Sequence, residues 1–227
     1  MQKIRTLAQL QEALDTEMGW RIKEISAFKL ATKTEESGRR AFVRAGVALV
    51  YAHWEGFIKT ASEAYLNFVD TQGHMYRDLK SCFAVFGLKS KLTTLIESKQ
   101  AKPNIDAFDF VLGELDNPAR MRMSSAIDTE SNLTSKVFAN IAHSLDIATT
   151  PYETKFNLID ESLVRRRNKV AHGEYLDMGA NDFRNLADEV LQMMRDYKTD
   201  LENAASMATY RRSLPPNMAQ ITSGSGT

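Results

Sequence analysis

Residues 162–175 read Ser-Leu-Val-Arg-Arg-Arg-Asn-Lys-Val-Ala-His-Gly-Glu-Tyr. No other part of the chain combines positive charge, a titratable ring and a helix-breaking glycine so closely. Four cations occupy the five positions from Arg165 to Lys169, and a histidine and a glycine follow at positions 172 and 173. If a helix runs from about Asp160 to Ala171, Gly173 suits the left-handed position just past its last turn. The stretch therefore predicts a basic helix that ends at a titratable ring.

His172 is expected at the C-terminal end of this helix, where unpaired carbonyls and the macrodipole favour a charged imidazolium. Such a ring is suited to donating a proton near neutral pH. Arg167 lies about 140° around the helix and roughly 7 to 8 Å along its axis from His172, a gap that a long guanidinium can bridge. Asn168 can donate and accept hydrogen bonds and so hold either partner. The alternative is a basic last turn that only complements the helix dipole.

A second long helix is expected from about residue 40 to 71, because apolar residues recur there at helical spacing. The core-facing stripe, within roughly a 100° arc, consists of Val43, Val47, Val50, Trp54, Phe57, Ile58, Ala61, Tyr65 and Phe68. Beside it Arg44, Tyr51 and Glu55 lie within about 40° of one another. Two interpretations stay open: an ionic network that positions Arg167 or His172, or a solvated edge of the helix.

These residues resemble those of a known family. Residues 167–172, Arg-Asn-Lys-Val-Ala-His, are similar to the signature of the HEPN superfamily, in which an arginine and a polar residue precede a histidine by a few positions. His172-Gly173-Glu174 also resembles many bacterial members. Residues 44–46 and 51–57, Arg-Ala-Gly and Tyr-Ala-His-Trp-Glu-Gly-Phe, are similar to the first core helix of a bacterial HEPN branch found among toxin–antitoxin and other defence genes. The resemblance covers roughly residues 1–205.

The resemblance implies a metal-independent endoribonuclease that needs no cofactor. The ribose 2′-OH would attack the adjacent phosphate and leave a 2′,3′-cyclic phosphate and a free 5′-OH. His172 would be the general acid/base, and Arg167 would stabilise charge on the phosphorane-like transition state. Asn168 would orient them, and Glu55 would fix the arginine or assist proton transfer.

The resemblance also implies partners: an RNA substrate, an antitoxin protein and a second copy of the chain. One histidine cannot comfortably serve both sides of an in-line displacement, so a homodimer that brings two motifs together is expected. Residues assigned to RNA binding are Arg165, Arg166 and Lys169, and those assigned to supporting roles are Arg44, Tyr51 and Glu174. The competing interpretation is a non-catalytic HEPN scaffold that binds a nucleotide, an antitoxin or a defence complex.

The composition is that of an ordinary globular protein, with 43% hydrophobic and 26% charged residues among 227. The net charge is zero, so any RNA site has to be local. The single cysteine, Cys82, excludes an internal disulfide framework and agrees with a reducing cytoplasm. The N-terminus lacks the apolar core of a signal peptide, and the longest apolar run, residues 45–52, is too short to span a bilayer. We therefore expect a cytoplasmic protein without a membrane anchor.

The periodicity predicts an all-α fold, a HEPN-like helical bundle with long N- and C-terminal helices. One helical domain is expected over residues 1–212, followed by a disordered tail over 213–227. The expected helices cover residues 2–35, 40–71, 77–86, 88–97, 104–112, 132–145, 150–171 and 181–211, with a loop over 119–130.

Other candidate sites carry weak patterns. His53, His74, His143 and Cys82 have no spacing typical of a metal site, and His53 is expected on the surface because it falls opposite the core stripe. No phosphate-binding glycine loop or nucleophile elbow occurs. The Trp and Tyr residues are interpreted as core rather than as base-stacking platforms.

Overall fold

The computed structural model describes residues 3–34, 38–121 and 127–212, and every regular element in these ranges is a helix. The α-helices are α1 (Leu7–Thr34), α2 (Arg39–Thr71), α3 (Ser81–Glu97), α4 (Ala101–Glu114), α5 (Ser135–Ser144), α6 (Arg165–Ala171) and α7 (Ala180–Ser206). Short 3₁₀ turns lie at η1 (Tyr76–Asp78) and η2 (Thr150–Lys155), and η3 (Leu158–Val164) is π-helical. The predicted all-α class is confirmed, and the expected tail over 213–227 lies outside the described residues.

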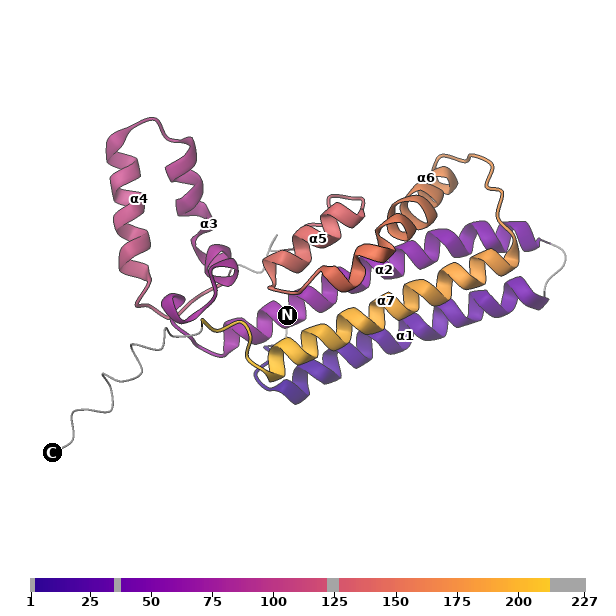
Figure 1. Cartoon of the computed structure of the whole chain (residues 1–227), viewed down its shortest axis with the longest axis horizontal. Helices are drawn as coiled ribbons and strands as arrows, with labels where there is room; N and C mark the ends of the chain where they lie inside the picture. The colour runs from indigo at the N-terminus through magenta and orange to yellow at the C-terminus, as the bar shows by residue number, and fades with distance from the viewer. Residues whose placement is uncertain (1–2, 35–37, 122–126, 213–227) are drawn as a thin grey trace.

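Three long helices form the body of the molecule. Figure 1 shows α1, α2 and α7 side by side, with α5 and α6 on one side of them and the α3–α4 hairpin standing at one end. The predicted stripe on α2 is buried throughout, with Trp54, Phe57 and Tyr65 fully inside. Burial of these apolar side chains is the main force that holds the three helices together.

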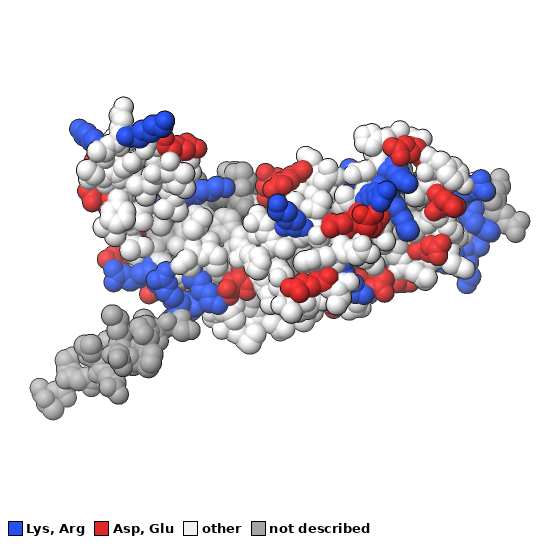
Figure 2. Space-filling model, turned by 45° about the horizontal axis from the view of Figure 1, so that its top comes forward, with Lys and Arg blue, Asp and Glu red and all other residues white. Residues whose placement is uncertain are grey.

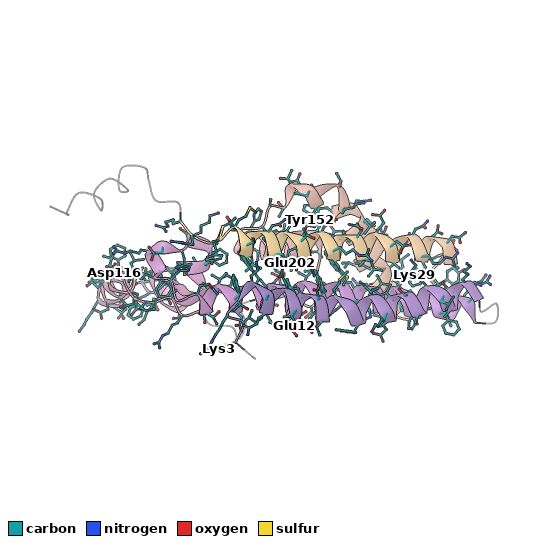
Figure 3. All side chains as sticks on the ribbon, turned by 90° about the horizontal axis from the view of Figure 1, so that it is seen from below. Lys3, Glu12, Lys29, Asp116, Tyr152 and Glu202 are labelled. Atoms are coloured by element: carbon teal, nitrogen blue, oxygen red, sulfur yellow. The ribbon has the colours of Figure 1, made fainter. Side chains whose placement is uncertain are left out.

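Polar contacts between the long helices fix their register. The hydroxyls of Ser62 on α2 and Tyr197 on α7 lie 2.7 Å apart in the core. Lys29 extends from α1 toward α7, where it pairs with Asp188 (Figure 3). Because a buried hydroxyl without a partner is costly, the Ser62–Tyr197 contact disfavours other registers of α2 against α7.

An aromatic cluster seats the elements that lead into the motif helix. The ring of Phe138 on α5 lies 5.3 Å from Trp54, 5.1 Å from Tyr152 and 5.6 Å from Tyr197, between ring centroids. The Tyr152 hydroxyl donates to Asp200 of α7 at 2.5 Å, so the turn η2 lies against that helix (Figure 3). The chain therefore enters η3 and α6 from a fixed point on the body.

Several predicted boundaries were wrong. The first helix begins at Leu7, where Thr6 and Gln9 form a capping box: Gln9 Oε1 accepts the Thr6 N–H and Thr6 Oγ1 accepts the Gln9 N–H. The last helix ends at Ser206, because Ala208 adopts a left-handed φ of 50° and the Thr209 N–H turns back to the Ala204 carbonyl.

The expected break at Gly87 was also wrong, since α3 runs through it. A Cβ at position 87 would lie 2.7 Å from the carbonyl oxygen of Arg120 and would overlap the Tyr76 hydroxyl. This glycine therefore permits close packing of α3 and does not end a helix. Within the predicted loop over 119–130, residues 119–121 and 127–130 are non-helical as expected, and 122–126 lie outside the described residues.

Candidate active site

The helix that carries the motif changes type immediately before it. In η3 the hydrogen bonds span five residues, so that the Arg165 N–H donates to the Asp160 carbonyl, and α6 then continues to Ala171. The expected α-helix from Asp160 was therefore wrong over its first turns. The Asp160 carboxylate accepts the N–H and the hydroxyl of Ser135 at 2.7 and 2.6 Å, at the start of α5. This contact ties the start of the motif helix to α5, and π-helical segments are common at functional sites.

The end of the motif helix has the predicted geometry. Gly173 has a φ of 72°, its N–H donates to the Val170 carbonyl at 3.1 Å, and the Glu174 N–H donates to Lys169 at 2.9 Å. These two bonds make a Schellman motif, which a glycine closes without steric cost. His172 is therefore the C-cap residue, directly after the last residue of α6, as expected from Gly173.

Arg167 points inward and is held on three sides. Its guanidinium carbon lies 3.9 Å from the centre of the Tyr51 ring. Its Nη2 donates to the carbonyl of Ser131 at 3.1 Å and to Oδ1 of Asn132 at 2.7 Å, while its Nε is buried without a partner among the described residues. The structure thus brings Tyr51 and Arg167 together, and it adds a loop that the sequence did not reveal.

Tyr51 links that loop to α2. Its side chain is 3% exposed, and its hydroxyl accepts the N–H of Leu133 at 2.8 Å. Burial raises the pKa of Tyr51, although the Leu133 N–H and the Arg167 guanidinium oppose the change. The ring therefore offers a neutral aromatic face to the arginine, as a cation–π contact requires.

The loop at residues 130–133 is strained where it meets Arg167. Glu130 and Ser131 have φ values of 52° and 61°, a left-handed conformation that costs a non-glycine residue on the order of 1 kcal/mol or more. Strained backbone persists where surrounding contacts impose it, and Arg167 and Tyr51 supply those contacts. Sequence reasoning missed Ser131 and Asn132 because nothing local to them shows that an arginine 35 residues away contacts this loop.

His172 differs from Arg167 in being open to solvent. Its side chain is exposed and bonds to no described residue, while its main-chain N–H donates to the Asn168 carbonyl at 2.9 Å. The half-buried Asn168 side chain also has no bond among the described residues, so its only recorded link to His172 is through the backbone. An imidazole in this position can exchange protons with a bound molecule without first breaking an internal contact.

The other predicted residues surround the motif without forming a single network. Arg44 donates to the main-chain carbonyl of Glu174, and Glu55 is half-buried, with no ion pair among the described residues. Arg167 is therefore held by Tyr51 and not by Glu55. Arg166 Nη1 lies 3.7 Å from the sulfur of Met178, and the exposed Arg165 pairs with Glu161 at 2.6 Å. The half-buried Lys169 completes the basic group on α6.

Cations gather in two places on this face (Figure 2), although the chain as a whole is neutral. Figure 2 shows Lys and Arg side chains over α6 and at the end of the molecule where α1 passes into α2, with carboxylates between them. Such a local group of cations is the kind of site that the zero net charge leaves possible for RNA.

The predicted surface position of His53 was wrong. Its side chain is 4% exposed, because α1 covers this face of α2: Trp20 lies against the ring at 5.0 Å and Glu24 Oε2 lies 3.0 Å from Nε2. Burial lowers the pKa of His53; Glu24 opposes this change, and the nearby Arg21 acts in the same direction as burial. The interpretation of the aromatic residues as core also fails at two positions, since Trp20 and Tyr175 are 45% and 68% exposed.

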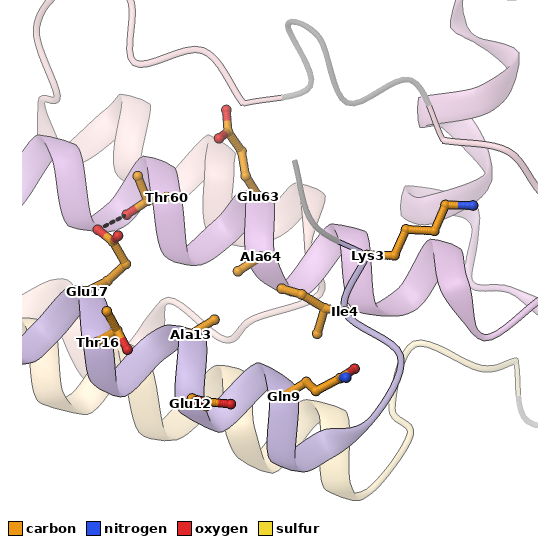
Figure 4. A pocket seen from close by; sticks show the side chains of 10 residues that line it. All are labelled: Lys3, Ile4, Gln9, Glu12, Ala13, Thr16, Glu17, Thr60, Glu63 and Ala64. Carbon is orange, nitrogen blue, oxygen red and sulfur yellow. Dashed lines mark hydrogen bonds between the residues drawn. The ribbon is translucent and has the colours of Figure 1, made fainter.

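A separate hollow of about 510 Å³ lies between α1 and α2 and contains none of the predicted site residues. Figure 4 shows Glu17 at one end of it, where its carboxylate accepts the Thr60 hydroxyl at 3.3 Å. Among residues 3–34, 38–121 and 127–212 no cluster of three His, Cys, Asp or Glu side chains could hold a metal ion. Within the same ranges no helix has the length and apolarity needed to cross a membrane.

The fold and site define a helical protein with a half-buried arginine and an exposed histidine, five residues apart at the end of one helix. The sequence model of the RiboL-PSP-HEPN family matches residues 16–203, and the chain belongs to this family. The resemblance to HEPN proteins is thereby confirmed at the level of the family, which is generally associated with RNases. Comparisons with curated proteins and with solved structures found no match.

Proposed function

We propose that this protein is a metal-independent endoribonuclease of the HEPN type, acting in the cytoplasm as a toxin or defence effector. The observation that carries the proposal is the exposed His172 ring at the end of the motif helix, five residues after an arginine in a fixed position. A solvent-open imidazole is a suitable general acid or base near neutral pH. The family match and the cations of α6 support RNA as the substrate.

The proposed reaction breaks one bond and forms one. The ribose 2′-oxygen attacks the adjacent phosphorus as its proton passes to a base, and the bond from phosphorus to the 5′-oxygen breaks as that oxygen gains a proton. The products are a 2′,3′-cyclic phosphate and a 5′-hydroxyl. His172 moves the protons, and Arg167 stabilises the charge that develops on the phosphoryl oxygens.

A dimer supplies the second proton-transfer group that this scheme needs. Two copies facing across a two-fold axis would contribute two His172 side chains, one for each side of the in-line displacement. They would also place eight cations in one cleft, Arg165, Arg166, Arg167 and Lys169 from each copy. Cations at this density hold single-stranded RNA by releasing its counterions.

A second candidate function is a non-catalytic HEPN scaffold that binds a nucleotide, an antitoxin or a defence complex. One observation favours it: Nη2 of Arg167 is occupied by the Ser131 carbonyl and Asn132 Oδ1. In a scaffold this arginine would serve only to hold the loop at residues 130–133. In the nuclease, a phosphoryl oxygen has to share the guanidinium with that loop or displace it.

The two functions are separated by removing the nucleophile from the substrate. Once a cleavage position is mapped in an oligoribonucleotide, the same oligonucleotide is made with one 2′-deoxynucleotide on the 5′ side of that phosphate. The nuclease should cut the all-RNA strand and leave the substituted position intact. Cutting at the deoxynucleotide would contradict 2′-OH attack, and a scaffold would cut neither strand.

The proposed toxic role is tested in bacteria. Expression of the wild-type chain should arrest growth and expression of His172→Ala should not, at equal protein levels. Equal growth with both forms would count against a toxin.

A further inference from the structure

Two neighbouring hollows lie on either side of the connection that leaves the motif. One, of about 550 Å³, lies between the start of α2 and residues 175–180. The other, of about 320 Å³, lies between α6 and the same connection. Leu176 and Asp177 line both, so the two hollows share a wall. Their volumes fall in or near the range in which proteins bind small ligands and nucleotides.

The shared wall is held from several directions. Arg44 of α2 donates to the Glu174 carbonyl, and Arg166 of α6 contacts the Met178 sulfur at 3.7 Å. At the far end the Gly179 N–H donates to Asp182 Oδ2 at 3.3 Å. A wall fixed in this way keeps the hollows open without a ligand, and preorganisation lowers the cost of binding.

Cations outnumber carboxylates in the lining of both hollows. Arg39 and Arg40 line the larger one, and Arg165, Arg166 and Lys169 line the smaller one. The carboxylates in the two linings are Glu161, which pairs with Arg165, and Asp177. An anionic ligand is therefore favoured over a cationic or neutral one.

An exposed aromatic ring accompanies these cations. Tyr175 lines the larger hollow together with Arg40 and is 68% exposed, whereas the tyrosines of the helical body are buried. It follows His172 by three residues, so their Cα atoms are at most about 11 Å apart. An exposed aromatic face beside a guanidinium is how proteins bind unpaired nucleotides, by stacking on the base and pairing with the phosphate.

We propose that the hollow between the start of α2 and residues 175–180 is a second subsite for single-stranded RNA. In it Tyr175 stacks on a base close to the cleaved phosphate, and Arg40 contacts a backbone phosphate. RNA as the ligand rests on the proposed function. The smaller hollow, with Arg166 and Lys169, continues the path toward α6. The subsite lets the enzyme hold an unpaired strand and disfavours a duplex, whose bases are already stacked on one another.

Binding is measured apart from cleavage, in the full chain carrying His172→Ala and in EDTA. The probe is a fluorescently labelled, unstructured oligoribonucleotide followed by anisotropy. Adding Tyr175→Ala should weaken binding about 5- to 100-fold through loss of one stacked base, and Tyr175→Phe should not. Adding Arg40→Ala should weaken binding and reduce the slope of log affinity against log salt by about 0.7, for one lost phosphate contact on a single strand.

Matched changes elsewhere provide controls. Phe108→Ala removes an aromatic ring that is 53% exposed on α4, and Arg195→Ala removes an exposed cation on α7. Neither should change RNA affinity by more than about twofold, as expected of residues outside a binding site. Circular dichroism of each variant shows whether its helices are retained.

The outcomes separate the subsite from the nuclease. Weakened binding with Tyr175→Ala and Arg40→Ala supports the subsite even if the wild-type chain proves unable to cleave. Unchanged affinity in both folded variants, or no RNA binding at all, overturns the subsite even if cleavage is observed. The subsite is also overturned if a free nucleoside 5′-monophosphate displaces the RNA at concentrations near the dissociation constant of the oligonucleotide. The hollow would then be a nucleotide site.

Discussion

Arg167 is the residue whose surroundings differ most from what the sequence suggested. The sequence predicted that Arg167 and His172 belong to one short helix, because a glycine follows His172 where a helix would end. The partners of Arg167 could not be predicted, because they come from α2 and from a loop that meets α6 only in the folded chain. Tyr51 was among the residues assigned a supporting role, and Asn132 was not. The role of Arg167 in stability must therefore be separated from any role in chemistry.

We predict that Arg167→Ala lowers the free energy of unfolding by about 1–3 kcal/mol, through loss of the contact with Tyr51 and the bonds to Ser131 and Asn132. Arg165→Ala, which removes an exposed ion pair with Glu161, should change it by less than about 0.5 kcal/mol. Urea unfolding followed by circular dichroism measures both. Equal effects of the two substitutions would mean that Arg167 does not hold the loop.

His53 should make stability depend on pH. Burial depresses its pKa in the folded chain, so below the usual value of about 6.5 the unfolded chain binds more protons than the folded one. Its contribution to stability is fully present above that pH and is lost as the pH falls toward the folded pKa. The groups of α1 that face the ring are Trp20, Arg21 and Glu24.

We predict that the melting temperature of wild type falls more steeply than that of His53→Gln as the pH is lowered from 7 toward 5. The comparison needs only thermal melts of the two proteins in a series of buffers. Parallel pH profiles would show that the buried histidine does not titrate between the folded and unfolded states.

The helices could be predicted better than their ends. The 3.6-residue spacing on α2 predicted its buried stripe, since an amphipathic helix buries its apolar face against whichever helix lies beside it. The helix boundaries depended on three features for which the sequence gives only a weak signal. These are the left-handed conformation of Ala208, the glycine inside α3 and the π-helical segment before α6. Gly87 and the π-helical segment make contacts with other elements, and Ala208 is part of a local turn at the end of α7, so propensity alone favours the simpler alternative in each case.

Two glycines in long helices should respond in opposite ways to alanine. A Cβ at Gly46 of α2 would overlap the Phe183 ring of α7, whereas at Gly19 of α1 nothing lies within 4 Å of it. Gly46→Ala should destabilise the protein by about 1–3 kcal/mol through overpacking, and Gly19→Ala should stabilise it by about 0.5–1 kcal/mol. Urea midpoints of the two variants test the packing of α2 on α7, and stabilisation by Gly46→Ala would contradict it.

At the scale of the molecule, the all-α class followed from periodicity and the family from the motif, whereas assembly depends on contacts between copies of the chain. The proposed chemistry requires two copies, since the motif offers a single histidine to a reaction with two proton transfers. We predict that light scattering after size exclusion gives about twice the chain mass of 25.6 kDa. Cleavage per chain should also fall on dilution below the dimer dissociation constant. A monomer with full activity at every concentration would rule out the shared site.

The central claim is that His172 and Arg167 cleave RNA without a metal. The measurement that tests it most directly is incubation of wild type, Arg167→Ala and His172→Ala with total RNA and transfer RNA in EDTA, followed by mapping of the product ends. We predict cleavage by wild type alone, with 2′,3′-cyclic phosphate and 5′-hydroxyl ends, while circular dichroism shows that both variants are folded. Cleavage that disappears in EDTA, or that survives in His172→Ala, would contradict the mechanism. If all three proteins are dimeric and inert, the protein is a binding scaffold.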